Sequence, residues 1–303
     1  MKNKMEKCLK ECKLCPHNCK VNRLEGVLGR CRTGKNVKVA LCDLHFFEEP
    51  CISGTNGSGT VFFSGCNLNC KYCQNYKISQ LGMGKEIEIE ELAEEFLRLL
   101  ERNANNINLV TGFMFIPQLV EAIKLAREKG LKIPIIYNSS GFESVDALKL
   151  LDGYIDVYLP DMKYYYDDLG KKLSNISNYF DISKAAIKEM YRQVGSPKFD
   201  ENGMIKKGLI IRHLVLPNHL QNSKEILKWI KYNIDEEVFV SIMAQYFPSY
   251  KANNEEDINR KLSLEEYEEI ERFVYKLDIK NGYLQDLESD EQKYVPDFES
   301  ANK

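Results

Sequence analysis

Two kinds of apolar pattern alternate along most of this chain: short unbroken runs, and longer stretches with helical spacing. The short runs predict strands at 59–64, 107–111, 133–137, 154–159, 209–216 and 238–244. The amphipathic stretches predict helices at 86–103, 117–130, 143–151, 183–194, 223–232 and 263–277. A Ser-x-x-Glu capping box, Ser263 to Glu266, opens the last helix. Strand followed by helix, repeated in this way, predicts parallel strands joined by right-handed crossovers.

The predicted fold is therefore α/β, with six strand–helix units in a partial barrel or, alternatively, a doubly wound sheet. In both arrangements, ligands bind beyond the carboxyl ends of the parallel strands. Residues that directly follow the predicted strands are thus candidates for a functional site. They fall in segments 66–73, 111–114, 138–141, 160–163, 217–219 and 245–246.

The two ends of the chain differ from this pattern. Residues 1–50 are predicted to form a loop-rich, cysteine-rich module, because 8–31 holds five Cys with no sustained apolar period. A bound metal would supply the stability that such a segment cannot gain from burial. Residues 51–287 are predicted to form the barrel, and 288–303 a frayed polar tail.

Composition limits the possible partners. The chain has 303 residues with 44% hydrophobic content, enough for a sizeable core. Its 42 basic and 45 acidic residues give a net charge of −3, which argues against bulk attraction to nucleic acid or to an anionic membrane. No apolar run is long enough to cross a bilayer, and the first residues lack the apolar core of a signal peptide. We therefore expect a cytoplasmic protein, in which clustered cysteines bind metal or do chemistry.

The most informative motif is a cysteine triplet directly after the first predicted strand. Three residues separate Cys66 from Cys70, and two separate Cys70 from Cys73. Thiolates at this spacing can wrap one face of an iron–sulfur cluster and leave one iron open for another ligand. A structural zinc site and unliganded loop cysteines are the alternatives.

A second group of cysteines lies nearer the start of the chain. Cys12, Cys15, Cys19 and Cys31 offer four thiolates, which suit either zinc or a second iron–sulfur cluster. A metal-free reduced loop is the alternative. Cys51 stands apart and is expected to be a buried core thiol.

The segment from Gly65 to Asn75 resembles the cluster-binding motif of radical S-adenosylmethionine (SAM) enzymes. Between about residues 50 and 250 the chain resembles pyruvate formate-lyase-activating enzymes and their uncharacterised homologues. The resemblance implies a partial (β/α)6 barrel of the radical SAM type. It also implies a 4Fe–4S cluster on Cys66, Cys70 and Cys73, and SAM on the open iron. Reductive cleavage of SAM would yield a 5′-deoxyadenosyl radical that abstracts hydrogen from a substrate.

For activating enzymes that hydrogen belongs to a glycyl residue of a partner enzyme, so a glycyl radical enzyme is the expected protein substrate. A flavodoxin or ferredoxin is the expected electron donor, and an anaerobic setting is implied. Radical modification of a peptide or small molecule is an alternative. A non-catalytic iron–sulfur electron carrier or redox sensor is another.

The resemblance extends to residues around SAM. Asp161 and Lys163 match the Asp-x-Lys of the activating enzymes, and Lys163 is the predicted catalytic residue. Thr111, Gly112, Asn138 and Ser139 are the predicted cofactor-binding residues. His213, which lies within a predicted strand, is expected to be structural.

Three departures from the activating enzymes matter. Phe113 and Met114 replace the Gly-Glu that follows Thr-Gly in those enzymes. Neutral Asn138 replaces an aspartate that helps to hold a cation, and Gln245-Tyr246 stands where a histidine is expected. These changes leave the cluster motif intact but put cation binding and a strict activating role in doubt.

Overall fold

The computed structural model describes residues 2–287 and 295–298. These residues form a ten-stranded, mostly parallel sheet in the order β10-β9-β8-β6-β5-β4-β2-β1-β3, with β7 paired to β8. The strands are β1 (Val37–His45), β2 (Ser58–Phe63), β3 (Lys85–Ile87), β4 (Ile107–Val110), β5 (Ile135–Ser139), β6 (Val157–Pro160), β7 (Lys198–Phe199), β8 (Ile205–Leu214), β9 (Phe239–Met243) and β10 (Asn281–Leu284). Neighbouring strands from β2 to β10 are parallel along this path. Within the described chain no pairing joins β10 to β3, so the barrel is open.

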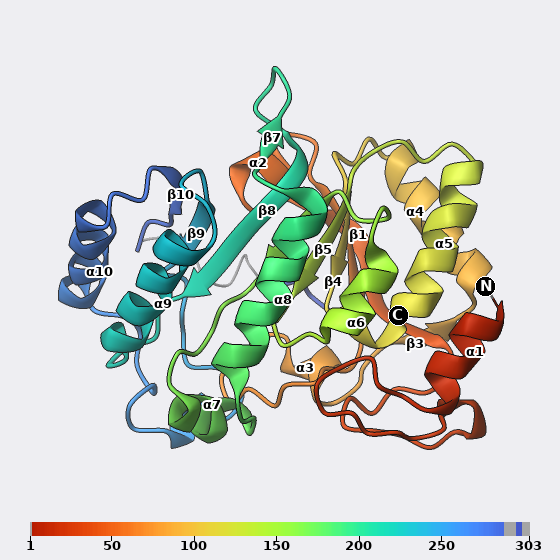
Figure 1. Cartoon of the computed structure of the whole chain (residues 1–303), viewed down its shortest axis with the longest axis horizontal. Coiled ribbons are helices and arrows are strands. Elements are labelled where there is room, and N and C mark those ends of the chain that lie inside the picture. The colour runs from red at the N-terminus through yellow and green to blue at the C-terminus, as the bar shows by residue number, and fades with distance from the viewer. Residues whose placement is uncertain (1, 288–294, 299–303) are drawn as a thin grey trace.

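Helices link the parallel strands, as the apolar spacing predicts, and several of them lie in front of the sheet in Figure 1. On α4 (Ile89–Glu101), Leu92, Phe96 and Leu99 face the core and are fully buried. Among the described residues, no helix combines the length and apolar character needed to span a bilayer. The helices are α1 (Lys2–Lys10), α2 (Pro50–Ser53), α3 (Tyr76–Ser79), α4 (Ile89–Glu101), α5 (Ile116–Glu128), α6 (Val145–Leu148), α7 (Asp167–Ser174), α8 (Tyr179–Val194), α9 (Leu220–Asn233) and α10 (Leu264–Lys276).

The six predicted strands and six predicted helices are all present, and the capping box at Ser263 and Glu266 is confirmed. Four strands were not predicted, among them the two-residue strand β7, which pairs antiparallel with β8. β1 lies within the segment 1–50, and it pairs antiparallel with β2, so the loop-rich prediction is wrong for these residues. β3 occupies the start of the predicted helix 86–103, because a short, charged edge strand is not distinguishable from an acidic first helical turn. β10 extends the parallel sheet beyond β9.

The predicted polar tail at 288–303 lies mostly outside the described residues. Phe298 is one of the described residues of this segment, and it is buried. Its ring packs edge-on against Phe62, with 5.4 Å between the ring centroids. At this position the chain is therefore anchored to the sheet by an apolar side chain.

Candidate functional site

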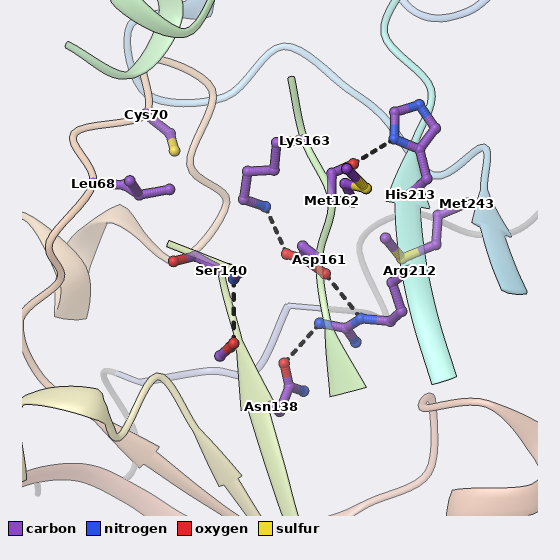
Figure 2. A network of polar contacts seen from close by, with 12 residues as sticks. Leu68, Cys70, Asn138, Ser140, Asp161, Met162, Lys163, Arg212, His213 and Met243 are labelled. Atoms are coloured by element: carbon purple, nitrogen blue, oxygen red, sulfur yellow. Dashed lines mark hydrogen bonds and ion pairs between the residues drawn. The ribbon is translucent and has the colours of Figure 1, made fainter. Parts of the chain in front are cut away.

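A cavity of about 220 Å³ lies at the carboxyl ends of the parallel strands, and we call it the cofactor cavity. Figure 2 shows part of its wall, where side chains from β5, β6 and β8 approach one another. Residues that are far apart in the sequence meet here because parallel strands end at the same edge of a sheet. Its lining includes Cys66, Cys70, Cys73, Thr111, Asn138, Ser139, Asp161, Lys163 and Arg212. Most of the predicted site residues therefore share one cavity.

The cysteine loop, residues 66–73, follows β2 and presents all three thiols to this cavity. The Ser174 hydroxyl donates a hydrogen bond to Cys70 Sγ at 2.9 Å, and the Leu68 amide donates to Cys66 Sγ at 3.4 Å. Burial raises the pKa of each thiol, that of Cys73 to about 11. Buried thiols that already receive hydrogen bonds are suited to become thiolates when a positively charged metal group is present.

The number of thiols at the cavity bears on which metal they could hold. Within the described residues, no three Cys, His, Asp or Glu side chains converge closely enough to hold a single metal ion. A structural zinc ion usually takes four protein ligands, whereas the cavity lining offers three thiols. Three thiols match the ligand set of a 4Fe–4S cluster with one open iron.

A buried ion network forms another part of the cavity wall. Lys163 Nζ donates to Asp161 Oδ2 at 2.6 Å, and Arg212 Nε donates to Asp161 Oδ1 at 2.9 Å. Arg212 also contacts Asn138 Oδ1 at 2.7 Å and Glu48 Oε2 at 3.1 Å. Burial would raise the pKa of Asp161, but Lys163 and Arg212 together hold it below its ordinary value. Asp161 is thus a fixed anion, with the Lys163 ammonium beside it (Figure 2).

Arg212 and Glu48 are site residues that sequence reasoning did not identify. Arg212 lies within β8, and Glu48 lies in the loop after β1. The local pattern held no sign that either was buried, because a charged residue in a strand or loop is usually solvated. The Arg212 guanidinium donates a hydrogen bond to Asn138, the residue that stands where the activating enzymes are expected to have an aspartate. The positive charge beside this position therefore comes from Arg212.

Of the residues that directly follow β4, only the first lines the cofactor cavity. Thr111 lines the cofactor cavity with a left-handed backbone, φ 60°, which is costly for a β-branched residue and is typical of functional sites. Gly112, in contrast, is not part of the cavity lining and packs against Leu119 and Phe63. Phe113 and Met114 are buried and line a different cavity, among the amino-terminal cysteines.

That smaller cavity, of about 10 Å³, is lined by Cys12, Cys15, Cys19 and Cys31 together. The Arg30 amide donates a hydrogen bond to Cys19 Sγ at 3.5 Å, and Cys31 Sγ lies 3.1 Å from Thr33 Oγ1. Burial raises the pKa of Cys15 to about 12. Four thiols around a space the size of about one water molecule have the donor set of a metal site, although they do not stand at single-ion distances.

The amino-terminal segment, residues 2–36, packs directly on the cysteine loop, and Figure 1 shows it in red at the same end of the sheet as α3. His17 Nε2 lies 2.8 Å from the Asn67 carbonyl oxygen. The buried Arg23 guanidinium donates to the carbonyls of Gly34 and Met114 at 2.5 to 2.9 Å. The segment therefore supports both the cysteine loop and the turn after β4.

Gly65, which precedes the cysteine loop, packs tightly against residues 31–33 of the amino-terminal segment. A Cβ at this position would lie 2.6 Å from Thr33 Cγ2 and 2.7 Å from the Cys31 carbonyl oxygen, at φ +93°. We expect Gly65→Ala to cost about 2–4 kcal/mol of unfolding free energy and to lower cluster content, because strain and overpacking add. Urea unfolding and iron analysis measure both effects.

Gly203→Ala is the matched control for this substitution. Its φ is +74°, but a Cβ there meets no atom within 4 Å, so only the backbone strain remains. We expect a cost of about 1 kcal/mol with normal iron content. Equal effects of the two substitutions would show that the contact at Gly65 is unimportant.

His213 is structural in this geometry, as expected from its strand. Its Nδ1 lies 2.6 Å from the Met162 carbonyl oxygen, and its Nε2 lies 2.8 Å from Ser223 Oγ. Because the carbonyl only accepts, Nδ1 carries the proton and Nε2 accepts from the hydroxyl. His213 thereby holds Met162, and with it the neighbouring Asp161 and Lys163, in place (Figure 2).

Burial lowers the pKa of His213 to about 4, so stability should depend on pH through this residue. Between pH 6.5 and 4 the unfolded chain binds a proton that the folded protein does not, so stability falls as pH falls. We expect the protein to lose about 2 kcal/mol more than His213→Asn between pH 7 and pH 5. Urea unfolding of both metal-free proteins at the two pH values measures this difference, and parallel losses would contradict it.

A parallel α/β barrel whose open end combines three thiols with a buried ion network defines a cofactor-dependent enzyme. Residues 60–205 match the family model described as the radical SAM superfamily. An uncharacterised protein of Methanocaldococcus jannaschii, MJ0674, is 36% identical over 284 residues, which cover 89% of this chain and 76% of that protein. The chain belongs to the radical SAM superfamily, whose members use a 4Fe–4S cluster and SAM.

Other similarities are more distant. The pyruvate formate-lyase-activating enzyme of Clostridium pasteurianum is 27% identical over 184 residues, 58% of this chain and 69% of that enzyme. Among solved structures, methylornithine synthase is 15% identical with a TM-score of 0.48, covering 71% of this chain. SuiB of Streptococcus suis bound to S-adenosylmethionine is 13% identical with a TM-score of 0.48, covering 73% of this chain. The chain spans 63% of the former structure and 48% of the latter, less than two thirds of each.

Proposed function

We propose that this enzyme binds a 4Fe–4S cluster through Cys66, Cys70 and Cys73, binds SAM beside it, and abstracts hydrogen from a glycyl residue of a partner enzyme. The observation that carries the cofactor assignment is the convergence of the three thiols with Asp161 and Lys163 on one cavity. When bound, the cluster supplies the electron that cleaves the sulfonium carbon–sulfur bond of SAM. A flavodoxin or ferredoxin is the proposed electron donor.

The chain's own residues supply binding and orientation. Lys163 is a suitable donor to the carboxylate of SAM, and ionised Asp161 is a suitable acceptor for its amine. Arg212, itself held by Asn138, donates to Asp161 from the other side, so the orientation of Asp161 does not depend on the ligand. Thr111 and Ser139 add polar groups to the wall, while Leu68, Ile78 and Leu214 restrict water.

The glycyl substrate is supported by the similarity to the activating enzyme of C. pasteurianum. Phe113 and Met114 weigh against a strict activating role, since they pack near the amino-terminal cysteines rather than lining the cofactor cavity. Radical modification of a peptide or a small molecule is therefore the second candidate. An electron carrier is the third, but it would not need the ion pair of Asp161 and Lys163 in the cavity.

The test is anaerobic. The protein is reconstituted with iron and sulfide, reduced with dithionite and mixed with SAM, and 5′-deoxyadenosine is assayed. Formation of the nucleoside supports the radical enzyme. An assembled cluster that forms no nucleoside, and whose spectrum SAM leaves unchanged, would contradict it and favour the carrier.

Iron and zinc are counted on the same sample, because we also propose a metal at Cys12, Cys15, Cys19 and Cys31. The shared cavity of these thiols supports this site. More than about four irons per chain would indicate a second cluster, and one zinc per chain a structural ion. Four irons without zinc would contradict the second metal.

A further inference from the structure

A second cavity, of about 340 Å³, adjoins the cofactor cavity. The two share five lining residues, Phe47, Glu48, Arg212, Met243 and Gln245, so they are separated by one layer of side chains. Strand β10 and the residues after it complete the second cavity, through Tyr283 and Gln285. A ligand in this space lies beside the site where SAM is proposed to be cleaved.

One polar group in the second cavity lacks a partner. Glu49 is 7% exposed, and its Oε2 atom accepts no hydrogen bond from any described residue. Ser241 is the polar side chain that acts on the Glu49 carboxyl by hydrogen bonding, and Oε2 still has no partner. The Gln285 side chain is engaged elsewhere: its Oε1 accepts from the amides of Ala244 and Gln245, and its Nε2 donates to Gln245 Oε1. A buried carboxyl oxygen without a donor is costly, so this atom is ready to accept a hydrogen bond from a ligand.

The charges around Glu49 are also unbalanced. Three buried carboxyls, Glu48, Glu49 and Asp161, lie near two buried cations, Lys163 and Arg212. Burial raises the pKa of Glu48 and Glu49, so these cations do not fully compensate the two carboxyls as anions. Both cations already contact Asp161, and Arg212 also contacts Glu48. Arg212 is the one cationic side chain among the described residues that line the second cavity. A ligand that brings positive charge would stabilise the ionised form of Glu49.

We propose that the second cavity is the substrate site, and that Glu49 binds a primary ammonium group of the substrate. The substrate class is then an amine, either a free small molecule or an amino group on a peptide. As a statement about the substrate, this inference rests on the proposed radical SAM function. A neutral amide donor is the competing ligand, because it would satisfy Oε2 without balancing the charge.

Binding of simple probes tests this proposal without the substrate. Saturation-transfer NMR at constant ionic strength compares n-butylammonium chloride with neutral n-butyramide. We expect the wild-type protein to bind n-butylammonium in preference to the amide. Glu49→Gln should weaken binding of n-butylammonium about tenfold or more, since a hydrogen bond between charged groups is lost. Glu49→Asp keeps the carboxylate, so its affinity for n-butylammonium should lie between those of the wild type and Glu49→Gln.

Glu201→Gln, on an exposed turn, is the control and should bind n-butylammonium like the wild type. Thermal unfolding first establishes that all variants are folded. The proposal is overturned if the wild type binds neither probe, if it prefers n-butyramide, or if Glu49→Gln binds n-butylammonium normally.

Assaying the same wild-type sample for 5′-deoxyadenosine keeps the two proposals apart. Nucleoside formation without ammonium binding would refute the amine site and support the radical function. Ammonium binding without nucleoside formation, in protein that holds its cluster, removes the radical function and with it the identification of the amine as a substrate.

Discussion

Cys70→Ala is expected to abolish SAM cleavage, lowering 5′-deoxyadenosine formation by at least about a thousandfold. Cys70 is the middle residue of the cysteine loop, and its Sγ receives the Ser174 hydrogen bond inside the cofactor cavity. With two thiols left, the loop no longer supplies the three ligands that hold a cluster with one open iron. Anaerobic iron analysis and the nucleoside assay measure the loss.

Cys42→Ala is the matched control. Cys42 lies on β1, where it pairs with Val61, and it does not line the cofactor cavity. This variant should keep its cluster iron and its nucleoside formation. Turnover by Cys70→Ala at a rate near that of the control would refute the assignment of the cluster.

Asp161→Asn is expected to cost about 3–5 kcal/mol of unfolding free energy and to weaken SAM binding about tenfold or more. The substitution leaves the buried Lys163 without a carboxylate partner and Arg212 with Glu48 alone, and an unpaired buried cation is unfavourable. Cluster iron should be unchanged, since Asp161 is not part of the cysteine loop. Thermal unfolding, titration with SAM and iron analysis measure the three quantities.

Asp152→Asn separates the effect of burial from that of distance. Asp152 lies 2.6 Å from Arg192, the same distance as between Asp161 and Lys163. The Asp152–Arg192 side chains are about half exposed, at 46% and 55%, whereas Asp161 and Lys163 are each 16% exposed. Exposed pairs contribute at most about 1 kcal/mol, so this variant should be nearly as stable as the wild type. Equal stability of the two variants would contradict the account of the buried network.

The repeating part of the fold could be predicted because its signals are local. Each strand between β2 and β9 in the parallel sheet has its own apolar run, and each long helix its own amphipathic face. β1, β3, β7 and β10 could not be predicted in the same way. β3 is short and charged, β10 contains a glycine and few apolar residues, and both are stabilised by partners distant in the sequence.

The residues of the candidate site also fall into a predictable and an unpredictable group. The cysteine loop and the Asp161–Lys163 pair lie in contiguous motifs, so their positions after strands could be predicted. Glu48, Glu49 and Arg212 have no such motif, and only the folded chain brings them to one wall. Burial of these charges depends on β1 and β10, the strands that the sequence pattern did not indicate.

The position of Arg23 bears on how this protein can be divided or recombined. Its guanidinium lies 5.6 Å from the Phe115 ring centre and binds the Met114 carbonyl, both in the turn after β4. A fragment beginning at β1 would leave this carbonyl without its donor and uncover the ring beneath it. Proteolytic trimming or domain exchange at that boundary would therefore damage the barrel itself. Chimaeras made between relatives should inherit the amino-terminal segment and the β4 turn from the same parent.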